Sequence, residues 1–414
     1  SEDCHRVNEF VMSSEATPSS ADIVIVGGAV MGSSVAYHIA KDPTFKGRVV
    51  VIEKDSTYQF SASALSAASI RQQFSSAVNI EISLYGISFL RNIGAHLSTE
   101  GEPLSIDLHE GGYLYLETTP GAPVLTETHR LQTQLGADIV LFDQAQVKVQ
   151  FPWLEVSDVV AASWGRTGEG WFDGWGLMQA FRKKARHLGV TYIDGEVTSV
   201  EREGGNIQAV RLKDGTRIAC GALVNTSGAS GGRALAGMAG VDIPVYGKKR
   251  CVFSFQCKGD VTNAPLLIDT TGTWCRPEGK RTADGQQFIC GGSPGEHDPE
   301  SNEFDVDWSL FEEIYWPALA ARVPAFEQIK PGRAWAGHYD MCDLDHNAII
   351  GRAVGYKNFY LANGFSGHGL QQSPAVGRGL AELLVHGRYI TLDLSALGHE
   401  RVIENRPLLE ANVI

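Results

Sequence analysis

Apolar positions near the N-terminus form two short continuous runs separated by a helical pattern. The first run covers residues 23–26 and the second covers residues 49–52. Continuous apolar runs of this length are typical of strands that are buried on both faces of a parallel sheet. Between the runs, a glycine pair is followed by apolar positions at helical spacing through residue 40. The pattern therefore predicts a strand–turn–helix–strand unit over residues 22–53.

The middle of the chain continues this alternation of helices and strands. Apolar residues recur at helical spacing over residues 80–90 and 177–188. Short strands are predicted over residues 190–212, with Asp214-Gly215 as a hairpin turn before the next strand. A second strand–turn–helix element is predicted over residues 222–238.

Beyond residue 243 the pattern changes. Strands and loops follow to about residue 333, with one helix predicted over residues 308–322. A buried strand over 358–362 then leads into a closing helix, which is predicted to begin near Pro374 because proline suits a first helical turn.

These elements predict an α/β fold with two domains, since 414 residues exceed what one simple core usually supports. One domain is Rossmann-like, and the other is a discontinuous, mostly antiparallel β domain of α+β type that holds the substrate. The Rossmann-like domain is predicted to comprise residues 21–105, 168–243 and 344–414, the substrate domain residues 106–167 and 244–343, and a flexible tail residues 1–20.

The glycines after the first strand have the spacing of a dinucleotide-binding turn. Gly27 allows a tight turn, and Gly32 lets the helix pack close to the strand. Glu53 stands 21 residues after Gly32, where a carboxylate can accept ribose hydroxyls. Ala29 replaces the middle glycine and adds a methyl group where the backbone approaches phosphate, and the neighbouring Gly28 keeps the turn flexible. The helix N-terminus favours a pyrophosphate.

Composition narrows the classes of partner. A net charge of −13 argues against nucleic acid and anionic membrane surfaces, and no apolar stretch is long enough to predict a membrane span. The seven cysteines are scattered without a C-x-x-C pair, which indicates reduced thiols and a cytoplasmic or other reducing compartment. Of these, Cys220, Cys251 and Cys290 lie in apolar runs and are predicted to be core residues.

The acidic residues, cysteine and histidine between Asp340 and His346 are of types that can bind a metal ion. Their spacing fits no standard zinc or calcium loop. We therefore predict a solvated hairpin there and no metal.

Four motifs carry a family resemblance. They are the unit from Gly27 to Glu53, the small-residue loop 61–69 that ends in Ile70-Arg71, the turn 223–228, and the Gly-Phe-Ser-Gly-His-Gly turn at 364–369. In this order they resemble the FAD-dependent amino-acid and amine oxidoreductases, the group of D-amino-acid oxidase, glycine oxidase and monomeric sarcosine oxidase. Within that group the chain is most similar to the FAD-dependent oxidoreductase domain-containing branch, which is linked to mitochondrial complex I assembly.

The resemblance implies that the dinucleotide is FAD. The first glycines would hold its pyrophosphate, Glu53 its adenosine ribose, and residues 364–371 the flavin pyrimidine, where a helix N-terminus favours the negative charge of reduced flavin. The cofactor-binding residues so implied are Gly27, Gly28, Ala29, Met31, Gly32, Glu53, Lys54, Ser61, Ser63, Ala64, Ser66, Ala67, Ala68, Ser69, Val197, Ser227, Gly228, Gly337, Gly364, Phe365, Ser366, Gly367, His368, Gly369, Leu370 and Gln371.

Four residues are candidates for the substrate side. Arg71 matches the arginine that pairs with the substrate carboxylate in sarcosine-oxidase-like members, and a guanidinium grips a carboxylate with two prongs. Tyr339 matches an active-site tyrosine, with a buried core tyrosine as the alternative. Gln371 stands where the sarcosine-type members carry a lysine. His338, beside Tyr339, is a further candidate.

Two departures from the family bear on the chemistry. Covalent members tether the flavin through a cysteine where this chain has Gly337, so FAD is predicted to be non-covalent. The lysine that activates oxygen in sarcosine-type oxidases is absent from residues 287–294. The sequence therefore leaves two possibilities, an oxidase or a dehydrogenase. The electron acceptor is oxygen or an unknown carrier.

The resemblance implies oxidation of the C–N bond of a small amino acid or secondary amine by hydride transfer to flavin N5, which gives an imine that hydrolyses to an oxo acid. Two alternatives remain open at this point. One is a 2-hydroxy-acid dehydrogenase on the same fold, since Arg71 would serve either substrate. The other is a flavin-containing assembly factor without turnover, whose partner is a protein complex. The oligomeric state is not predicted.

Overall fold

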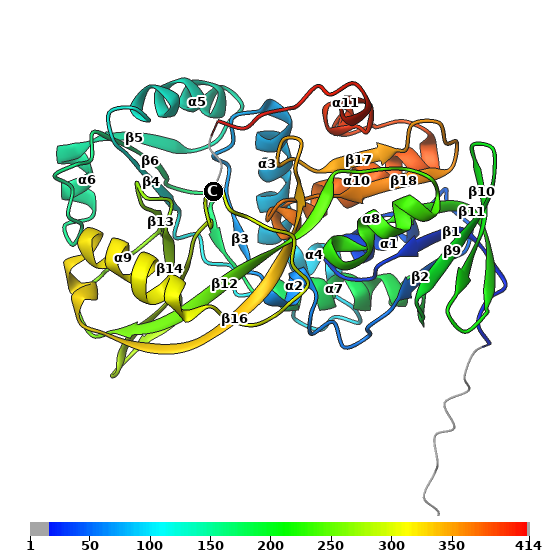
Figure 1. The fold of residues 1–414 in the computed structure, drawn as a ribbon, viewed down its shortest axis with the longest axis horizontal. Helices are drawn as coiled ribbons and strands as arrows, with labels where there is room; N and C mark the ends of the chain where they lie inside the picture. The colour runs from blue at the N-terminus through cyan, green and yellow to red at the C-terminus, as the bar shows by residue number, and fades with distance from the viewer. Residues whose placement is uncertain (1–15, 412–414) are drawn as a thin grey trace, which may run out of the picture.

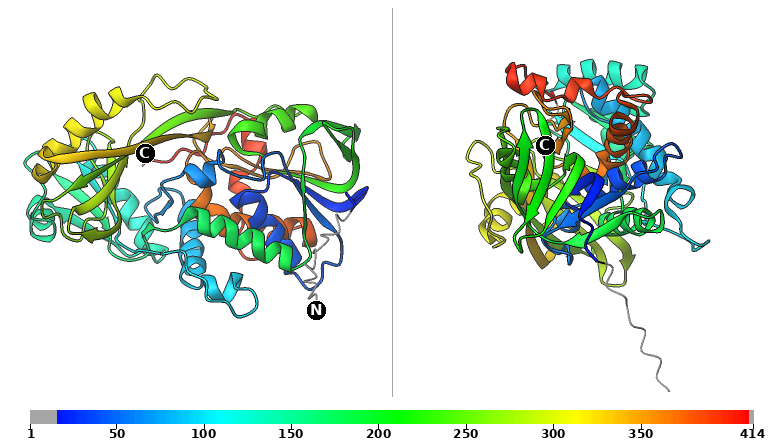
Figure 2. Two further views of the ribbon diagram at one scale, coloured as in Figure 1. Left: turned by 90° about the horizontal axis from the view of Figure 1, so that it is seen from below. Right: turned by 90° about the vertical axis from the view of Figure 1, so that its right-hand side faces the viewer.

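The computed structural model describes residues 16–411 as two lobes that lie side by side, each built around an eight-stranded sheet (Figure 1). The two further views in Figure 2 show the same division along the long axis of the molecule. Residues 1–15 of the predicted tail lie outside the described residues, and Ser20, its last residue, belongs to the first strand.

The sheet of the first lobe is parallel at its centre. Its main strand order is β17-β18-β11-β1-β2-β8, with β10 antiparallel beside β11 and β9 antiparallel beside β10. Only β17 is antiparallel to its neighbour along the main path. The bounds are β1 Ser20–Val26, β2 Val49–Glu53, β8 Thr191–Asp194, β9 Val197–Glu203, β10 Asn206–Leu212, β11 Arg217–Asn225, β17 Ile349–Arg352 and β18 Phe359–Asn363.

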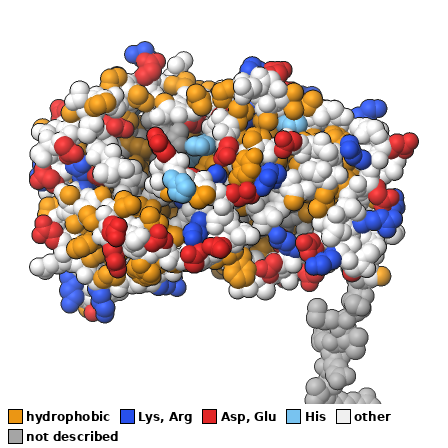
Figure 3. All heavy atoms as spheres, in the orientation of Figure 1, with side chains coloured by type: hydrophobic (Ala, Val, Ile, Leu, Met, Phe, Trp, Pro, Cys, Tyr) orange, Lys and Arg blue, Asp and Glu red, His pale blue; other side chains and the backbone are white. Residues whose placement is uncertain are grey.

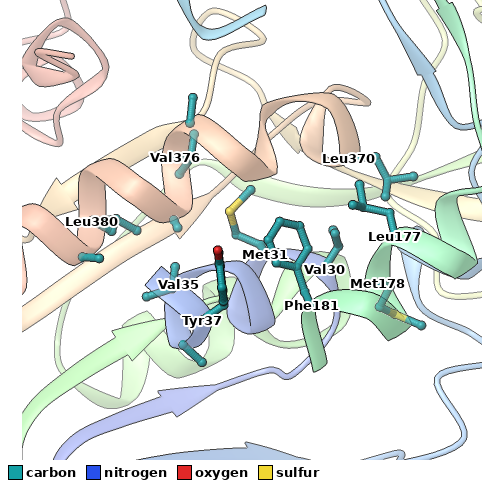
Figure 4. Close-up of a cluster of buried hydrophobic side chains, with 14 of the residues drawn as sticks. Val30, Met31, Val35, Tyr37, Leu177, Met178, Phe181, Leu370, Val376 and Leu380 are labelled. Carbon is teal, nitrogen blue, oxygen red and sulfur yellow. The ribbon is translucent and has the colours of Figure 1, made fainter. Parts of the chain in front are cut away.

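Helices cover both faces of this sheet because its central strands are apolar on both sides. Ile23 and Ile25 of β1 belong to a core with α1 (Val30–Ala40), α7 (Gly174–His187) and α10 (Gly369–His386). Figure 4 shows side chains of these three helices meeting. Val24, between the two isoleucines, belongs to the opposite core with α8 (Gly228–Met238), as period-two alternation requires. The remaining helices of this lobe are α2 Ala62–Leu65, α3 Ala77–Arg91, α4 Ile93–Leu97 and α11 Glu400–Ile403.

The second sheet has the order β16-β12-β15-β14-β13-β4-β6-β5. Its neighbouring strands are antiparallel except for the parallel pair β13 and β4. The bounds are β4 Tyr113–Glu117, β5 Ile139–Asp143, β6 Ala161–Gly165, β12 Val245–Cys257, β13 Leu266–Ile268, β14 Trp274–Thr282, β15 Gly285–Gly291 and β16 Ile329–Cys342, and the helices are α5 Ala122–Gln134, α6 Gln144–Gln150 and α9 Trp316–Arg322. A separate ribbon pairs β3 (Ser69–Ile70) with β7 (Gly170–Trp171). The predicted fold class is thereby confirmed, whereas the domain boundaries stay a prediction.

Two helices differ from the sequence prediction. The closing helix α10 begins at Gly369, so Pro374 lies inside it rather than in its first turn. Pro374 cannot donate to the carbonyl of Leu370, and the Ser373 hydroxyl donates to that carbonyl instead, at 2.8 Å. The helix predicted over residues 308–322 is not α-helical throughout. Its Leu310–Tyr315 segment is a π-helix, which directly precedes α9 and Pro317.

The segment from Asp340 to His346 is not the solvated hairpin that we predicted. Asp340, Cys342 and Asp345 are buried. Asp345 forms a buried ion pair with Arg401, with Nε and Oδ2 2.7 Å apart. Segments far along the chain bury these residues, and the guanidinium of Arg401 neutralises the charge of Asp345.

The six cysteines within residues 16–411 are buried and unbridged, so Cys220, Cys251 and Cys290 are core residues as predicted. Among the helices of these residues, none combines the length and the apolar character that a membrane crossing needs. On the face drawn in Figure 3, acidic and basic side chains are interspersed rather than gathered into one patch.

Removing the Phe181 ring tests the core that carries α1, α7 and α10. Phe181 is fully buried, and its ring centroid lies 5.5 Å from that of Phe89 and 5.8 Å from that of Tyr37. We expect Phe181→Ala to lower the free energy of unfolding by about 3–5 kcal/mol in urea titrations. Trp175→Ala, on the exposed side of the same helix, is expected to change it by about 0.5 kcal/mol or less. Equal losses from the two substitutions would contradict this packing.

Candidate functional site

The dinucleotide turn requires glycine at two of its positions. Gly27 has φ of +96°, and a Cβ there would lie 2.3 Å from the carbonyl oxygen of Thr226. A Cβ on Gly32 would lie 1.8 Å from the carbonyl oxygen of Gly27. Ala29, in contrast, has φ of −71° and ψ of −158°, an extended conformation that any residue adopts. The backbone therefore accepts alanine in place of the middle glycine.

Glu53 joins the end of β2 to this turn. Its Oε2 accepts the N–H of Gly28 at 2.8 Å, and its Oε1 accepts the N–H of Asp55 at 3.0 Å. Helix α1 begins at Val30, and its N-cap residue Ala29 provides no side-chain cap. The N–H of Val30 donates to Ser63, and the helix N-terminus still favours an anion. The tight glycine turn and this helix N-terminus fit the pyrophosphate of FAD.

The other residues predicted around the turn lie in several settings. Ser63 accepts the N–H of Val30 at 3.3 Å, and Ser227 donates to the carbonyl of Val26 at 3.0 Å, so both border the turn. Met31 and Val197 are buried in the two cores of the first lobe, and Lys54 is exposed.

The loop at 61–69 is held in part by the second lobe. Trp335 Nε1–H donates to the carbonyl of Leu65 at 3.0 Å, and Arg276 Nη2 donates to the carbonyl of Ala67 at 2.5 Å. Within the loop, Ser66 Oγ accepts the N–H of Ala68, whose φ is +49°. Because the second lobe fixes these carbonyls, the loop has a defined path between the two lobes.

Asp340 holds the turn at 364–369, a role that we did not predict. Its Oδ2 accepts the N–H groups of Gly364 at 2.8 Å and of Phe365 at 3.2 Å. Burial raises the pKa of the Asp340 carboxyl to about 6, although these two hydrogen bonds act in the opposite direction. Gly367 has φ of +92° and lies against Tyr339, since a Cβ there would be 2.6 Å from the ring. Helix α10 begins directly after this turn without a side-chain cap.

A small cavity of about 60 Å³ opens where this turn, the 61–69 loop and the second sheet meet. Its lining residues come from both lobes. From the sequence prediction it contains Ala67, Ser69, Arg71, Tyr339, Ser366, Gly367, His368 and Gln371, and it adds Tyr113, Leu266, Ile268 and Trp274.

Arg71 is buried at the polar side of this cavity, with 2% of its surface exposed. Its Nη1 donates to the carbonyl of Gln73 at 2.5 Å, and its guanidinium carbon lies 3.9 Å from the ring centroid of Phe74. Its backbone N–H donates to Gln371 Oε1 at 3.0 Å. Two of its five side-chain N–H groups are therefore used by protein groups when the contact to His368 is included, and the other three have no partner among residues 16–411.

His368 contacts Arg71 in a fixed protonation state. The distance from Arg71 Nη2 to His368 Nε2 is 3.1 Å. Burial and the charge of Arg71 lower the pKa of His368 well below its ordinary value. Because a guanidinium only donates, Nε2 accepts and the ring carries its proton on Nδ1.

His338 and Gly337 lie outside the lining of the cavity. His338 precedes Tyr339 on β16, so it points to the other face of the strand. Its ring packs against Phe304, with the centroids 4.5 Å apart. A Cβ on Gly337 would lie 2.9 Å from Cβ of Leu65, so any side chain at this position would displace the 61–69 loop.

Glu169 is a second buried carboxyl that the sequence pattern did not reveal. It accepts the N–H of Gln72 at 2.6 Å, the N–H of Gln73 at 3.2 Å and Nε2 of Gln73 at 2.9 Å. Gln73 in turn accepts from Arg71, so Glu169 fixes the segment that carries the guanidinium. The only sequence signal is its place between Gly168 and Gly170. Gly165 leaves room for its carboxyl, since a Cβ there would lie 1.5 Å from Oε1.

Burial raises the pKa of the Glu169 carboxyl to about 7, opposed by its hydrogen bonds and by Arg71. The folded protein therefore keeps a proton that the unfolded chain releases near its ordinary pKa of 4.5. This contribution to stability is complete below about pH 4.5 and is lost as the pH rises to about 7.

We expect Glu169→Gln to remove this part of the pH dependence. Between pH 5 and 7.5 the wild type should lose stability relative to the variant, by up to the order of 3 kcal/mol, in urea unfolding. Glu127→Gln, an exposed glutamate on α5, is the matched control and should follow the wild type. If the free energy of unfolding changed with pH in the same way in the wild type and in Glu169→Gln, the raised pKa of Glu169 would be contradicted.

Comparison with known proteins agrees with this geometry. The chain is 39% identical to FAD-dependent oxidoreductase domain-containing protein 1 of Xenopus laevis, over 98% of this chain and 87% of that protein. It is 23% identical to the mitochondrial sarcosine dehydrogenase of Mus musculus, over 91% of this chain and 41% of that protein. The crystal structure of L-proline dehydrogenase from P. horikoshii superimposes with a TM-score of 0.81 at 26% identity, covering 94% of this chain and 100% of that one. The family model described as FAD dependent oxidoreductase (DAO) matches residues 22–383. The chain therefore belongs to the DAO family of FAD-dependent oxidoreductases.

Proposed function

We propose that this protein uses non-covalent FAD to oxidise the C–N bond of a small amino acid or secondary amine that carries a carboxylate. The observation that carries the proposal is the buried guanidinium of Arg71 in the cavity between the two lobes. A buried cation with free donors, next to the turn that resembles a flavin-binding turn, suits a substrate carboxylate.

The residues present fit FAD as the cofactor. Gly27 and Gly32 allow the close backbone packing of a dinucleotide-binding turn, and the N-cap residues of α1 and α10 provide no side-chain cap. The 61–69 loop and the 364–371 segment would hold the flavin between them. When bound, FAD supplies the oxidising chemistry by accepting a hydride from the substrate. The collision of a Cβ at Gly337 with Leu65 supports non-covalent attachment, because a tethering cysteine does not fit there.

The side chains of the cavity would orient the substrate rather than exchange protons with it. Arg71 would bind the carboxylate through its three available N–H groups and so fix the position of the Cα–H. Neutral His368 holds one edge of the guanidinium. Burial raises the pKa of Tyr339, so its hydroxyl stays protonated and serves as a donor. The amine is expected to bind in its neutral form.

The chemistry of the relatives' substrates supports this assignment. Sarcosine dehydrogenase and L-proline dehydrogenase are named for sarcosine and proline. Both compounds are secondary amines that carry one carboxylate. A cavity with a single buried cation is suited to that class.

An anaerobic titration of the FAD-loaded protein tests the proposal. Amino acids, N-methyl amino acids and cyclic imino acids should bleach the flavin absorbance, and the matching 2-hydroxy acids should not. Bleaching by hydroxy acids alone, or by no compound of the panel, would contradict the proposal. The second of these results would favour an assembly factor without turnover. Hydrogen peroxide formation on admitting air then distinguishes an oxidase from a dehydrogenase.

Loss of the guanidinium should weaken carboxylate binding. We expect Arg71→Met to lower kcat/KM roughly 100-fold or more, since it removes a buried charge-assisted pair. The flavin spectrum of the resting protein should stay unchanged. Arg130→Met, at an exposed position on α5, is the matched control and should keep wild-type kinetics. An Arg71→Met variant with unchanged KM would show that the carboxylate binds elsewhere.

A further inference from the structure

The cavity has two walls of opposite character. One wall is polar and comes from the first lobe, with Arg71, His368 and Gln371. The other wall comes from the second sheet and consists of Tyr113, Leu266, Ile268 and Trp274; we call it the apolar wall. A substrate whose carboxylate contacts Arg71 must place the rest of its body near the apolar wall.

Strand register makes the apolar wall continuous. Leu266 and Ile268 are two residues apart on β13 and therefore share one face of the sheet. Leu266 pairs with Tyr113 of β4, and Ile268 pairs with Trp274 of β14. The wall thus spans three neighbouring strands. Leu266 is 3% exposed and Ile268 is 7% exposed, so both side chains are fixed by packing.

A glycine on the next strand makes room for the indole. Trp274 pairs with Gly291 of β15. A Cβ on Gly291 would lie 2.8 Å from Cζ2 of Trp274. The absence of a side chain at Gly291 therefore lets the indole lie across β15 and extends the apolar wall.

Only one formal charge lines this cavity among the described residues, that of Arg71. Arg276 is near, but its Nη1 donates to Glu278 at 2.8 Å and its Nη2 to the carbonyl of Ala67. The Tyr113 hydroxyl donates to Ser69 at 2.5 Å. The apolar wall therefore has no cation among the described residues, and the indole N–H of Trp274 is its one side-chain donor without a partner there. A second carboxylate placed there would exchange its hydration for at most this one neutral donor.

We propose that the cavity selects amines that carry one carboxylate and an apolar substituent, and rejects those with a second carboxylate. The inference rests on the proposed function, because it assigns the first carboxylate to Arg71. It goes further by naming the residues of the apolar wall as the determinants of specificity.

Substrates of matched shape test the selection. The side chains of leucine, asparagine and aspartate have the same branched outline but are apolar, polar and charged. We expect kcat/KM for N-methylleucine to exceed that for N-methylaspartate at least about 100-fold, in the enantiomer that reacts. N-methylasparagine should fall between them. A preference for N-methylaspartate, or equal values, would overturn the proposal.

Binding of ligands that cannot react separates this inference from the proposed function. The deaminated skeletons are 4-methylpentanoate and succinate, and calorimetry on the FAD-loaded protein measures both. We expect 4-methylpentanoate to bind at least about 100-fold more tightly than succinate. This result together with no flavin reduction by any amine would support the selection and contradict the proposed function. Tighter binding of succinate, or no binding of either acid, would overturn the selection.

A positive charge placed in the apolar wall should weaken the preference for an apolar ligand over one with a second carboxylate. Ile268→Arg is expected to reduce the affinity ratio of 4-methylpentanoate to succinate at least about 10-fold. Val160→Arg, which adds the same charge at an exposed position outside the cavity, should leave the ratio unchanged. An unchanged ratio in Ile268→Arg would overturn the role of the wall.

A second variant covers the case in which Ile268→Arg does not fold. Trp274 is only partly buried, so Trp274→Ala is expected to fold. The substitution should weaken the binding of 4-methylpentanoate at least about 10-fold and leave the binding of acetate unchanged. Equal losses for the two acids, or no loss for either, would overturn the proposal.

Discussion

The contact between residues 69–73 and residues 366–371 is the constraint on which the site depends. Arg71 and Gln371 are 300 positions apart, yet the backbone N–H of Arg71 donates to the Gln371 amide, and its guanidinium meets His368. Gln371 lies in the first turn of α10, the helix that packs on α1 in the main core of the first lobe. The helix that completes the core therefore also places the polar wall of the cavity. A shift of α10 would disturb both.

Two buried carboxyls, one on β16 and one beside β7, keep this contact in place. Asp340 at the end of β16 holds the backbone of the 364–369 turn, and Glu169 beside β7 holds the segment after Arg71. Each accepts backbone N–H groups that would otherwise be buried without a partner. The second sheet thus has two roles in the site. It provides the apolar wall, and through Asp340 it holds the 364–369 turn of the polar wall.

The features that could be predicted from the sequence are those with local causes. Strand β2 begins at Val49, where its apolar run begins, and Gly32 is required by its contact with Gly27 in the same turn. The parallel sheet and its helices followed from such patterns. Ala29 departs from the motif, but its backbone conformation is one that alanine adopts readily.

The features that could not be predicted depend on partners far along the chain. Glu169 acts on residues 96 and 97 positions away, and Asp340 acts on a turn 24 positions away. Neither stands in a motif. Tyr339 matches an active-site tyrosine of the family and its neighbour His338 is a weaker candidate, and the pairing of β16 decides that Tyr339 faces the cavity. The short apolar run of β13 predicts a strand, but only its pairing with β4 and β14 shows that its side chains line the cavity.

The central claim is that a buried arginine and an apolar wall together bind one carboxylate with an apolar body. A crystal structure of the FAD-loaded protein with 4-methylpentanoate tests it most directly. The account predicts the carboxylate on the guanidinium of Arg71 and the branched methyl groups against Ile268 and Trp274. A ligand bound in this cavity with its carboxylate away from Arg71, or bound only outside the cavity, would contradict it.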